Sequence, residues 1–215
     1  MNARTLISVL VLGLATNGCT EWQRNVTLNG VPFCRATVRE DGYVLGLLSR
    51  ETVVQGRPCA PGWLHLHANG VAAAFTSAQP IALGTSLLPG GTWIRQDARG
   101  TIQFCAFPAA TAIQGQACRG TGGSKGVTTA FYASGALKTF FPVRAVVIDG
   151  VTCRGGLLNG WIALHENGRL QSGVLDADLE RDGRRYRRGE RVEFDREGHV
   201  TRRSEPVLDT FTVGA

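Results

Sequence analysis

The stretch WLHLHANGVA, residues 63–72, returns as WIALHENGRL at residues 161–170, and this pair decides the fold. The glycines in the two stretches belong to a series of similar turns, formed by Gly42, Gly70, Gly100, Gly135, Gly168 and Gly198. Their spacing of 28 to 35 residues indicates an internal repeat. We therefore predict six imperfect units of one structural kind.

Each unit has the pattern of a β-hairpin. Asn-Gly and similar dipeptides between alternating runs mark hairpins, because Gly adopts the positive φ that a tight primed turn requires. Around Gly70, the apolar residues Leu64, Leu66 and Ala72 recur with a period of two, as they do on a strand with one buried face. The sequence thus predicts an all-β protein whose hairpins form an extended or curled antiparallel sheet. A closed barrel or a sandwich is the alternative, because an open sheet leaves two edges exposed.

A second glycine precedes each of these hairpins and is followed, three or four residues later, by Cys, Leu or Tyr. A position that accepts these three types is most simply a buried packing site. The stretches are LNGVPFC (28–34), VQGRPC (54–59), ALGTSL (82–87), IQGQAC (113–118), IDGVTC (148–153) and RDGRRY (181–186).

Over residues 26–203, these glycine-marked units resemble the MORN-like hairpin repeats found in many bacterial envelope and antitoxin-type proteins. The YxGxW core that is usual in such units is missing from this chain. The resemblance implies one continuous repeat domain over this range, with residues 19–25 as a linker and residues 204–215 as a tail.

The N-terminus resembles a bacterial lipoprotein signal. A basic MNAR, an apolar TLISVLVLGLAT and the segment NGC predict a signal peptide over residues 1–18, too short in its apolar part to remain as a membrane span. The resemblance implies acylation of Cys19, and Thr20 after it implies sorting to the outer membrane; ordinary signal cleavage is the alternative. We expect an exported envelope protein that faces the periplasm or the surface and contacts the membrane through its lipid anchor.

An exported location favours disulfides among the cysteines. Equivalent cysteines of neighbouring units should lie two strands apart, about 9.6 Å, which exceeds the roughly 7 Å limit between bridged Cα atoms. Cys105 is the one cysteine outside the repeat pattern, and Cys118 follows at the entrance to the next unit. We therefore predict a disulfide between Cys105 and Cys118. No CxxC motif occurs, and no Cys stands beside a His, so a metal site is not expected.

Three tryptophans, Trp63, Trp93 and Trp161, each stand seven residues before their hairpin glycine. Indole rings on one sheet face could stack on sugar rings, and they could equally cover the sheet by packing. His67 and His165 also share one position, three residues before the glycine. With His65 they could suit a metal ion, but two units separate His165 from the other two, so we interpret these side chains as solvent-facing strand residues.

Basic residues gather near the C-terminus. Residues 181–203 hold nine arginines and five acidic residues, in a chain of net charge +6. Arg184, Arg185, Arg187 and Arg188 are candidate anion-binding residues, because guanidinium groups make bidentate contacts with oxyanions. The alternative is a polar outer face on the terminal unit. The mixture of signs and the expected export argue against a nucleic-acid partner.

No catalytic motif such as GxSxG or HExxH occurs, and no motif calls for a cofactor. We expect a binding or structural role without catalysis, with an envelope protein or a glycan as partner. The alternative is a carbohydrate-active enzyme in which Glu166, Asp176 and Asp178 converge in three dimensions.

Overall fold

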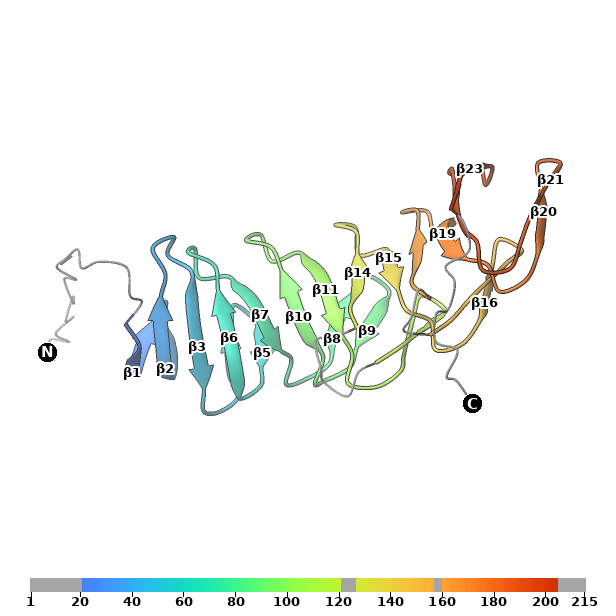
Figure 1. Ribbon diagram of the computed structural model, residues 1–215. Coiled ribbons are helices and arrows are strands. Elements are labelled where there is room, and N and C mark those ends of the chain that lie inside the picture. Colours follow the sequence, from blue (N-terminus) through green and yellow to red (C-terminus); the bar gives the residue numbers. More distant parts are fainter. Residues whose placement is uncertain (1–20, 121–126, 157–159, 205–215) are drawn as a thin grey trace, which may run out of the picture.

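The computed structural model describes residues 21–120, 127–156 and 160–204, and these residues are all-β. Thirteen of the described strands form one open antiparallel sheet, and the others pair into five short hairpins (Figure 1). The predicted antiparallel hairpin array is confirmed, and the sheet does not close into the alternative barrel. The predicted signal peptide, Cys19 and residues 205–215 lie outside the described residues. No helix of the described part is long and apolar enough to cross a membrane.

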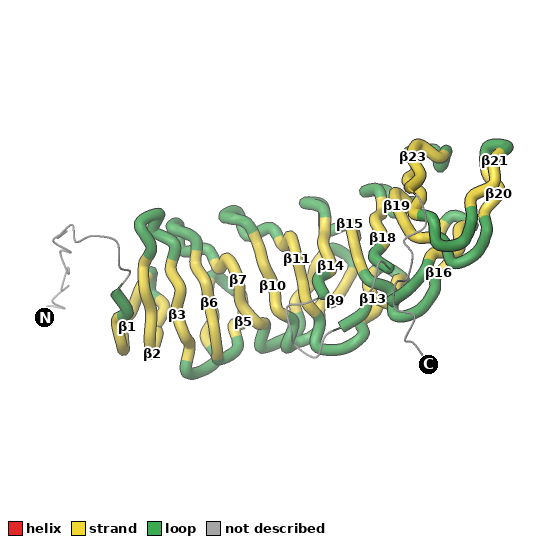
Figure 2. The backbone as a smooth tube through the Cα atoms, viewed as in Figure 1, coloured by secondary structure: helices red, strands yellow, loops and turns green. Residues whose placement is uncertain are grey.

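The strands of the main sheet lie side by side in chain order, with loops at both ends (Figure 2). They are β1 (Gln23–Leu28), β2 (Val31–Val38), β3 (Val44–Leu48), β6 (Gly62–Leu66), β7 (Ala72–Thr76), β10 (Trp93–Gln96), β11 (Ile102–Ala106), β14 (Thr129–Phe131), β15 (Leu137–Phe140), β18 (Ile162–Leu164), β19 (Leu170–Val174), β22 (Arg191–Phe194) and β23 (Val200–Ser204).

Five short hairpins alternate along the chain with the long hairpins of the sheet. They pair β4 (Thr52–Val54) with β5 (Arg57–Cys59), β8 (Ile81–Leu83) with β9 (Ser86–Leu88), β12 (Thr111–Ile113) with β13 (Gln116–Cys118), β16 (Val146–Ile148) with β17 (Val151–Cys153), and β20 (Leu179–Arg181) with β21 (Arg184–Tyr186). A unit therefore contains two hairpins, one long and one short. Both glycine series of the sequence mark turns, the first in the long hairpins and the second mainly in the short ones.

The long hairpins of the first glycine series do not use the tight primed turn that the Asn-Gly pattern predicts. Gly70 N–H donates to His67 O at 2.8 Å, His67 N–H donates to Val71 O at 2.8 Å, and of the central residues only Gly70 has a positive φ. This is the wider turn with a glycine bulge, and the register shifts at the bulge between His65 and Leu66. Asn69 favours it because its side-chain oxygen accepts the Val71 N–H at 3.2 Å.

The short hairpins do use two-residue turns. Gln55 and Gly56 both have positive φ, 47° and 77°, as the primed turn of type I′ requires. In β8–β9 the glycine comes first in the turn, so that Ile81 pairs with Leu88. The predicted packing residue Leu87 is therefore wrong by one position: Leu87 is exposed and Leu88 is buried. A shift of one residue moves a strand side chain to the opposite face.

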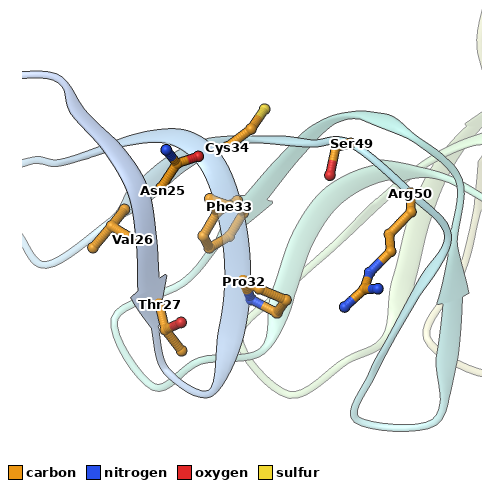
Figure 3. A pocket seen from close by; sticks show the side chains of 8 residues that line it. All are labelled: Asn25, Val26, Thr27, Pro32, Phe33, Cys34, Ser49 and Arg50. Atoms are coloured by element: carbon orange, nitrogen blue, oxygen red, sulfur yellow. The ribbon is translucent and has the colours of Figure 1, made fainter.

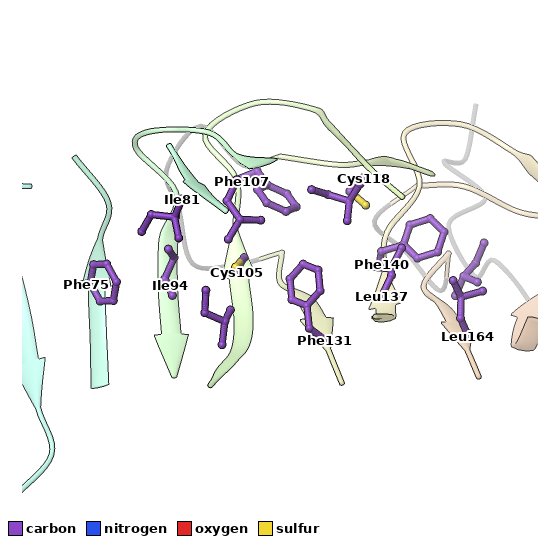
Figure 4. Close-up of a cluster of buried hydrophobic side chains, with 14 of the residues drawn as sticks. Phe75, Ile81, Ile94, Cys105, Phe107, Cys118, Phe131, Leu137, Phe140 and Leu164 are labelled. Atoms are coloured by element: carbon purple, nitrogen blue, oxygen red, sulfur yellow. The ribbon is translucent and has the colours of Figure 1, made fainter. Parts of the chain in front are cut away.

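The hydrophobic core lies between the main sheet and the layer of short hairpins. Figure 4 shows sheet residues such as Ile94 and Phe131 below Ile81 and Cys118 of the hairpin layer. The predicted packing role is confirmed for four members of the second glycine series, since Cys59, Cys118, Cys153 and Tyr186 are all buried in this core. The fourth cysteine of the series, Cys34, is only partly buried, and Phe33 fills the core there.

The disulfide expected between Cys105 and Cys118 is absent. All five described cysteines carry free thiols. Cys105 belongs to the sheet and Cys118 to the hairpin layer, and both are fully buried as packing residues. Each unit contributes a second layer besides its sheet strands, and the spacing of the cysteines does not indicate that layer.

A repeated polar contact joins each of the last three short hairpins to the long hairpin that follows. The acceptor is the side chain of the residue that stands just before the turn glycine of the short hairpin. The donor is a backbone N–H in the next long hairpin, two residues after the glycine of that hairpin. Gln114 accepts from Leu137 at 2.9 Å, Asp149 from Leu170 at 2.8 Å, and Asp182 from Val200 at 3.0 Å. We call this contact the clasp. It closes the two layers over the core and sets the distance between them.

Candidate functional site

The outward face of the main sheet is the side opposite the hairpin layer. Strand pairing places one continuous row of residues across it, which comprises Leu45, His65, Ala74, Arg95, Phe104, Ala130, Thr139, Ala163, Ser172 and Glu193. Between Ala130 and Ser172 the residues of this row are small. Taller side chains, including Arg95 and Phe104, stand on the N-terminal side of these small residues.

The largest exposed aromatic group lies at the N-terminal end of this face. Trp63 on β6 is 51% exposed, and its ring meets that of Trp22 edge to face with 5.9 Å between centroids. The Arg35 guanidinium lies over the Trp22 ring, 4.3 Å from its centroid. Trp93 stands on β10 and is partly buried. One strand, β7, lies between β10 and β6. The sheet thus places Trp63 and Trp93 on one half of the face.

Trp161 is separate from the other two predicted tryptophans, because the strands β11, β14 and β15 lie between it and Trp93. Its ring is covered by the Arg191 guanidinium, 3.9 Å from the ring centroid. Burial lowers the pKa of Arg191, which also donates to the Trp161 carbonyl oxygen at 3.4 Å. Cation–π contacts of this kind stabilise a packed surface. The spacing of the tryptophans did not predict this covering arginine, whose partner lies thirty residues away.

The two equivalent histidines were expected to face solvent, and they instead link units. His67 and the Gln96 carbonyl oxygen are 3.0 Å apart, and His165 and the Phe194 carbonyl oxygen are 2.9 Å apart. Tyr132 occupies the same position in its unit and donates to the Leu164 carbonyl oxygen at 2.9 Å. These side chains reach the neighbouring hairpin, so their role is structural.

The four predicted anion-binding arginines fall into two kinds. Arg185 pairs with Asp178 at 2.7 Å, and Arg188 pairs with Asp176 at 3.1 Å. In the described part of the chain, the side chains of Arg184 and Arg187 have no hydrogen bond or ion pair. The four residues are therefore not one cluster, and two of them already have anionic partners.

The carboxylates of the enzyme alternative do not form a catalytic pair. The Arg188 backbone N–H and the Arg185 side chain hold the pKa of Asp178 below its usual value, so this group stays ionised and is a poor general acid. Asp176 is engaged by Arg188, and Glu166 accepts a hydrogen bond from Ser134 at 2.6 Å. Within the described ranges, no group of three or more His, Cys, Asp or Glu side chains is placed to hold a metal ion.

Hollows occur at both ends of the array. Figure 3 shows the N-terminal one, a cavity of about 310 Å³ beside β1 and β2 whose lining includes Asn25, Phe33 and Arg50. At the other end, a groove of about 470 Å³ lies between β21 and β23 and is lined largely by arginines. The sequence indicated the charge of that end, but it could not indicate the groove, which depends on the second layer.

Comparison with known protein families, with curated proteins and with solved structures finds no match. The resemblance to MORN-like repeats therefore stays a prediction.

Proposed function

We propose that this protein is an exported, envelope-associated repeat scaffold that binds glycan chains along the outward face of its sheet, without catalysis. The observation that carries the proposal is the exposure of Trp22 and Trp63, 38% and 51%, side by side on that face. Large aromatic rings that stay in water at neighbouring positions are typical of an interaction surface.

The chemistry of this surface fits a sugar polymer. The C–H face of a sugar ring is apolar and flat enough to pack on an indole ring, while its hydroxyl groups need polar partners. Arg35 beside Trp22 and exposed Arg95 beside Trp93 supply guanidinium donors for hydroxyl or carboxylate groups. An open array of strands offers an extended surface of the kind that repeat proteins use for elongated ligands.

The location rests on the sequence. The N-terminal segment predicts export, and acylation of Cys19 would hold the scaffold at the membrane, within reach of envelope glycans. An intact mass of the mature chain tests the anchor: we expect acyl chains on Cys19. A mature mass without them would remove the membrane from the proposal.

The glycan role is tested by titrating the mature chain with a soluble N-acetylglucosamine oligomer in a calorimeter. We expect Trp63→Ala to weaken binding by about tenfold, since one stacking contact contributes roughly 1–1.5 kcal/mol. Leu87→Ala is the matched control, because Leu87 is also an exposed apolar residue but lies on the hairpin layer. Equal binding by wild type and Trp63→Ala, with both folded, would refute the proposed surface.

A further inference from the structure

The groove at the C-terminal end of the described array lies between the short hairpin β20–β21 and the edge strand β23. Its lining residues come from the short hairpin and from β23, and they are Arg184, Arg185, Tyr186, Val200, Thr201, Arg202 and Arg203. Tyr186 is buried and Val200 is partly buried, so the groove has an apolar base beneath charged walls.

Strand register places one arginine of the sheet on the core side. Arg203 is paired with Val192, a fully buried core residue, and directly paired residues point to the same face. In an earlier long hairpin, the corresponding residue opposite Ile94 is Cys105, which is fully buried. Arg203 thus occupies a position that belongs to the core in the earlier hairpin.

The short hairpin contributes a second arginine in the same way. Arg184 pairs with Arg181, whose guanidinium lies over the core ring of Phe194 at 5.7 Å. In the preceding short hairpin, the corresponding pair is Ile148 and Val151, and both are buried. The side chains of Arg184 and Arg203 therefore come from the two layers and face the same opening.

The charges in the groove are only partly balanced. Arg181 donates to the carbonyl oxygens of Gly198 and Asp149, Arg185 is paired with Asp178, and Arg202 lies 4.0 Å from Glu193. For the side chains of Arg184 and Arg203, the described residues provide no hydrogen bond or ion pair. Two like charges facing one opening repel each other, and an anion between them would remove that repulsion.

We propose that this groove binds the phosphate group of an anionic ligand, held between Arg184 and Arg203. Guanidinium groups fit phosphate oxygens through two parallel N–H bonds each, which favours phosphate over a single acceptor. Tyr186 and Val200 contact the uncharged part of the ligand. The site lies on the core side of the sheet and is independent of the glycan surface.

The test uses inorganic pyrophosphate as the probe, titrated into the mature chain in a calorimeter. We expect Arg184→Gln and Arg203→Gln each to weaken binding tenfold or more, as the loss of a charged hydrogen-bonding partner does. Arg187→Gln is the matched control, since Arg187 is exposed, lies on the same segment and does not line the groove. We expect it to bind as the wild type does. A thermal midpoint for each variant shows that it is folded.

Two results would overturn the proposal. One is no binding of pyrophosphate by the folded wild type, and the other is an equal loss in Arg187→Gln, which would mean that only net charge matters. A second arm uses vesicles of phosphatidylglycerol and phosphatidylcholine in equal parts. Vesicle binding that is lost in Arg184→Gln identifies a lipid headgroup as the source of the phosphate. Pyrophosphate binding without vesicle binding identifies a soluble phosphorylated ligand.

Discussion

At the scale of single residues, the buried thiols show how this chain uses cysteine. Cys59, Cys105, Cys118 and Cys153 are at most 1% exposed and lie among aliphatic and aromatic core residues. Burial raises the pKa of each to about 12. Since the thiolate is the reactive form, these groups behave as small apolar side chains and not as nucleophiles.

These raised pKa values predict a loss of stability at alkaline pH. At pH values between the usual thiol pKa of 9.0 and the raised pKa of about 12, the folded chain keeps protons that the unfolded chain releases. The stabilisation is therefore complete below the lower value and falls as the pH rises toward the higher one. Urea unfolding at about pH 8 and about pH 10 measures the fall. This loss of unfolding free energy should be smaller in Cys118→Ala than in the wild type. Equal stability of the wild type at both pH values would contradict the expectation.

Sequence patterns predicted the burial of single residues where the same position recurs in several units with the same backbone conformation. The burial of Cys153 and Tyr186 followed from their distance to a turn glycine. The same rule was wrong at Leu87, because Gly84 comes first in its turn and shifts the register by one residue. The contacts of His67 and Arg191 could not be predicted, since their partners lie 29 and 30 residues away in neighbouring units.

At the scale of elements, the clasp between short and long hairpins has a measurable effect. Gln114 donates to the Gly135 carbonyl oxygen at 2.9 Å and accepts from the Leu137 N–H at 2.9 Å. We expect Gln114→Ala to lower the free energy of unfolding by about 1–3 kcal/mol, because two hydrogen bonds are lost and one backbone N–H loses its partner. Urea unfolding of the purified chain measures the change.

Gln55→Ala is the matched control for the clasp. Gln55 occupies the equivalent turn position with nearly the same φ, 47° against 48° for Gln114. Its side chain makes no hydrogen bond with any described residue, so its removal should change the free energy of unfolding by less than about 0.5 kcal/mol. Similar losses of unfolding free energy in the two variants would show that the turn, and not the clasp, accounts for the destabilisation.

The long hairpins could be predicted from sequence, and the second layer could not. A strand such as β6, with five residues, is long enough to show alternation between buried and exposed side chains. The strands of the short hairpins have three residues each, too few to reveal a period. Without that layer, neither the covering of one sheet face nor the groove beside Arg184 could be foreseen.

At the scale of the whole molecule, β1 and β23 are the first and last of the described strands across the sheet. Every strand between them has a neighbour on each side, so we expect amide hydrogen exchange to be slowest in the central strands and fastest at β1 and β23. Exchange measured by mass spectrometry on peptides along the chain tests this. Uniform protection from end to end would indicate a single cooperative unit instead of an array of neighbours.

The edge strand β23 also disfavours association of two copies of this protein through their sheet edges. It carries Arg202 and Arg203 side by side, both exposed, and charged side chains on an edge oppose pairing with another sheet.

Because the clasp recurs in the last three units with the same donor and acceptor positions, these units share one kind of joint. Duplication or deletion of one of these units in the gene would preserve that joint and change only the length of the protein. Natural selection could thus adjust the reach of this molecule in steps of one unit, without inventing a new contact.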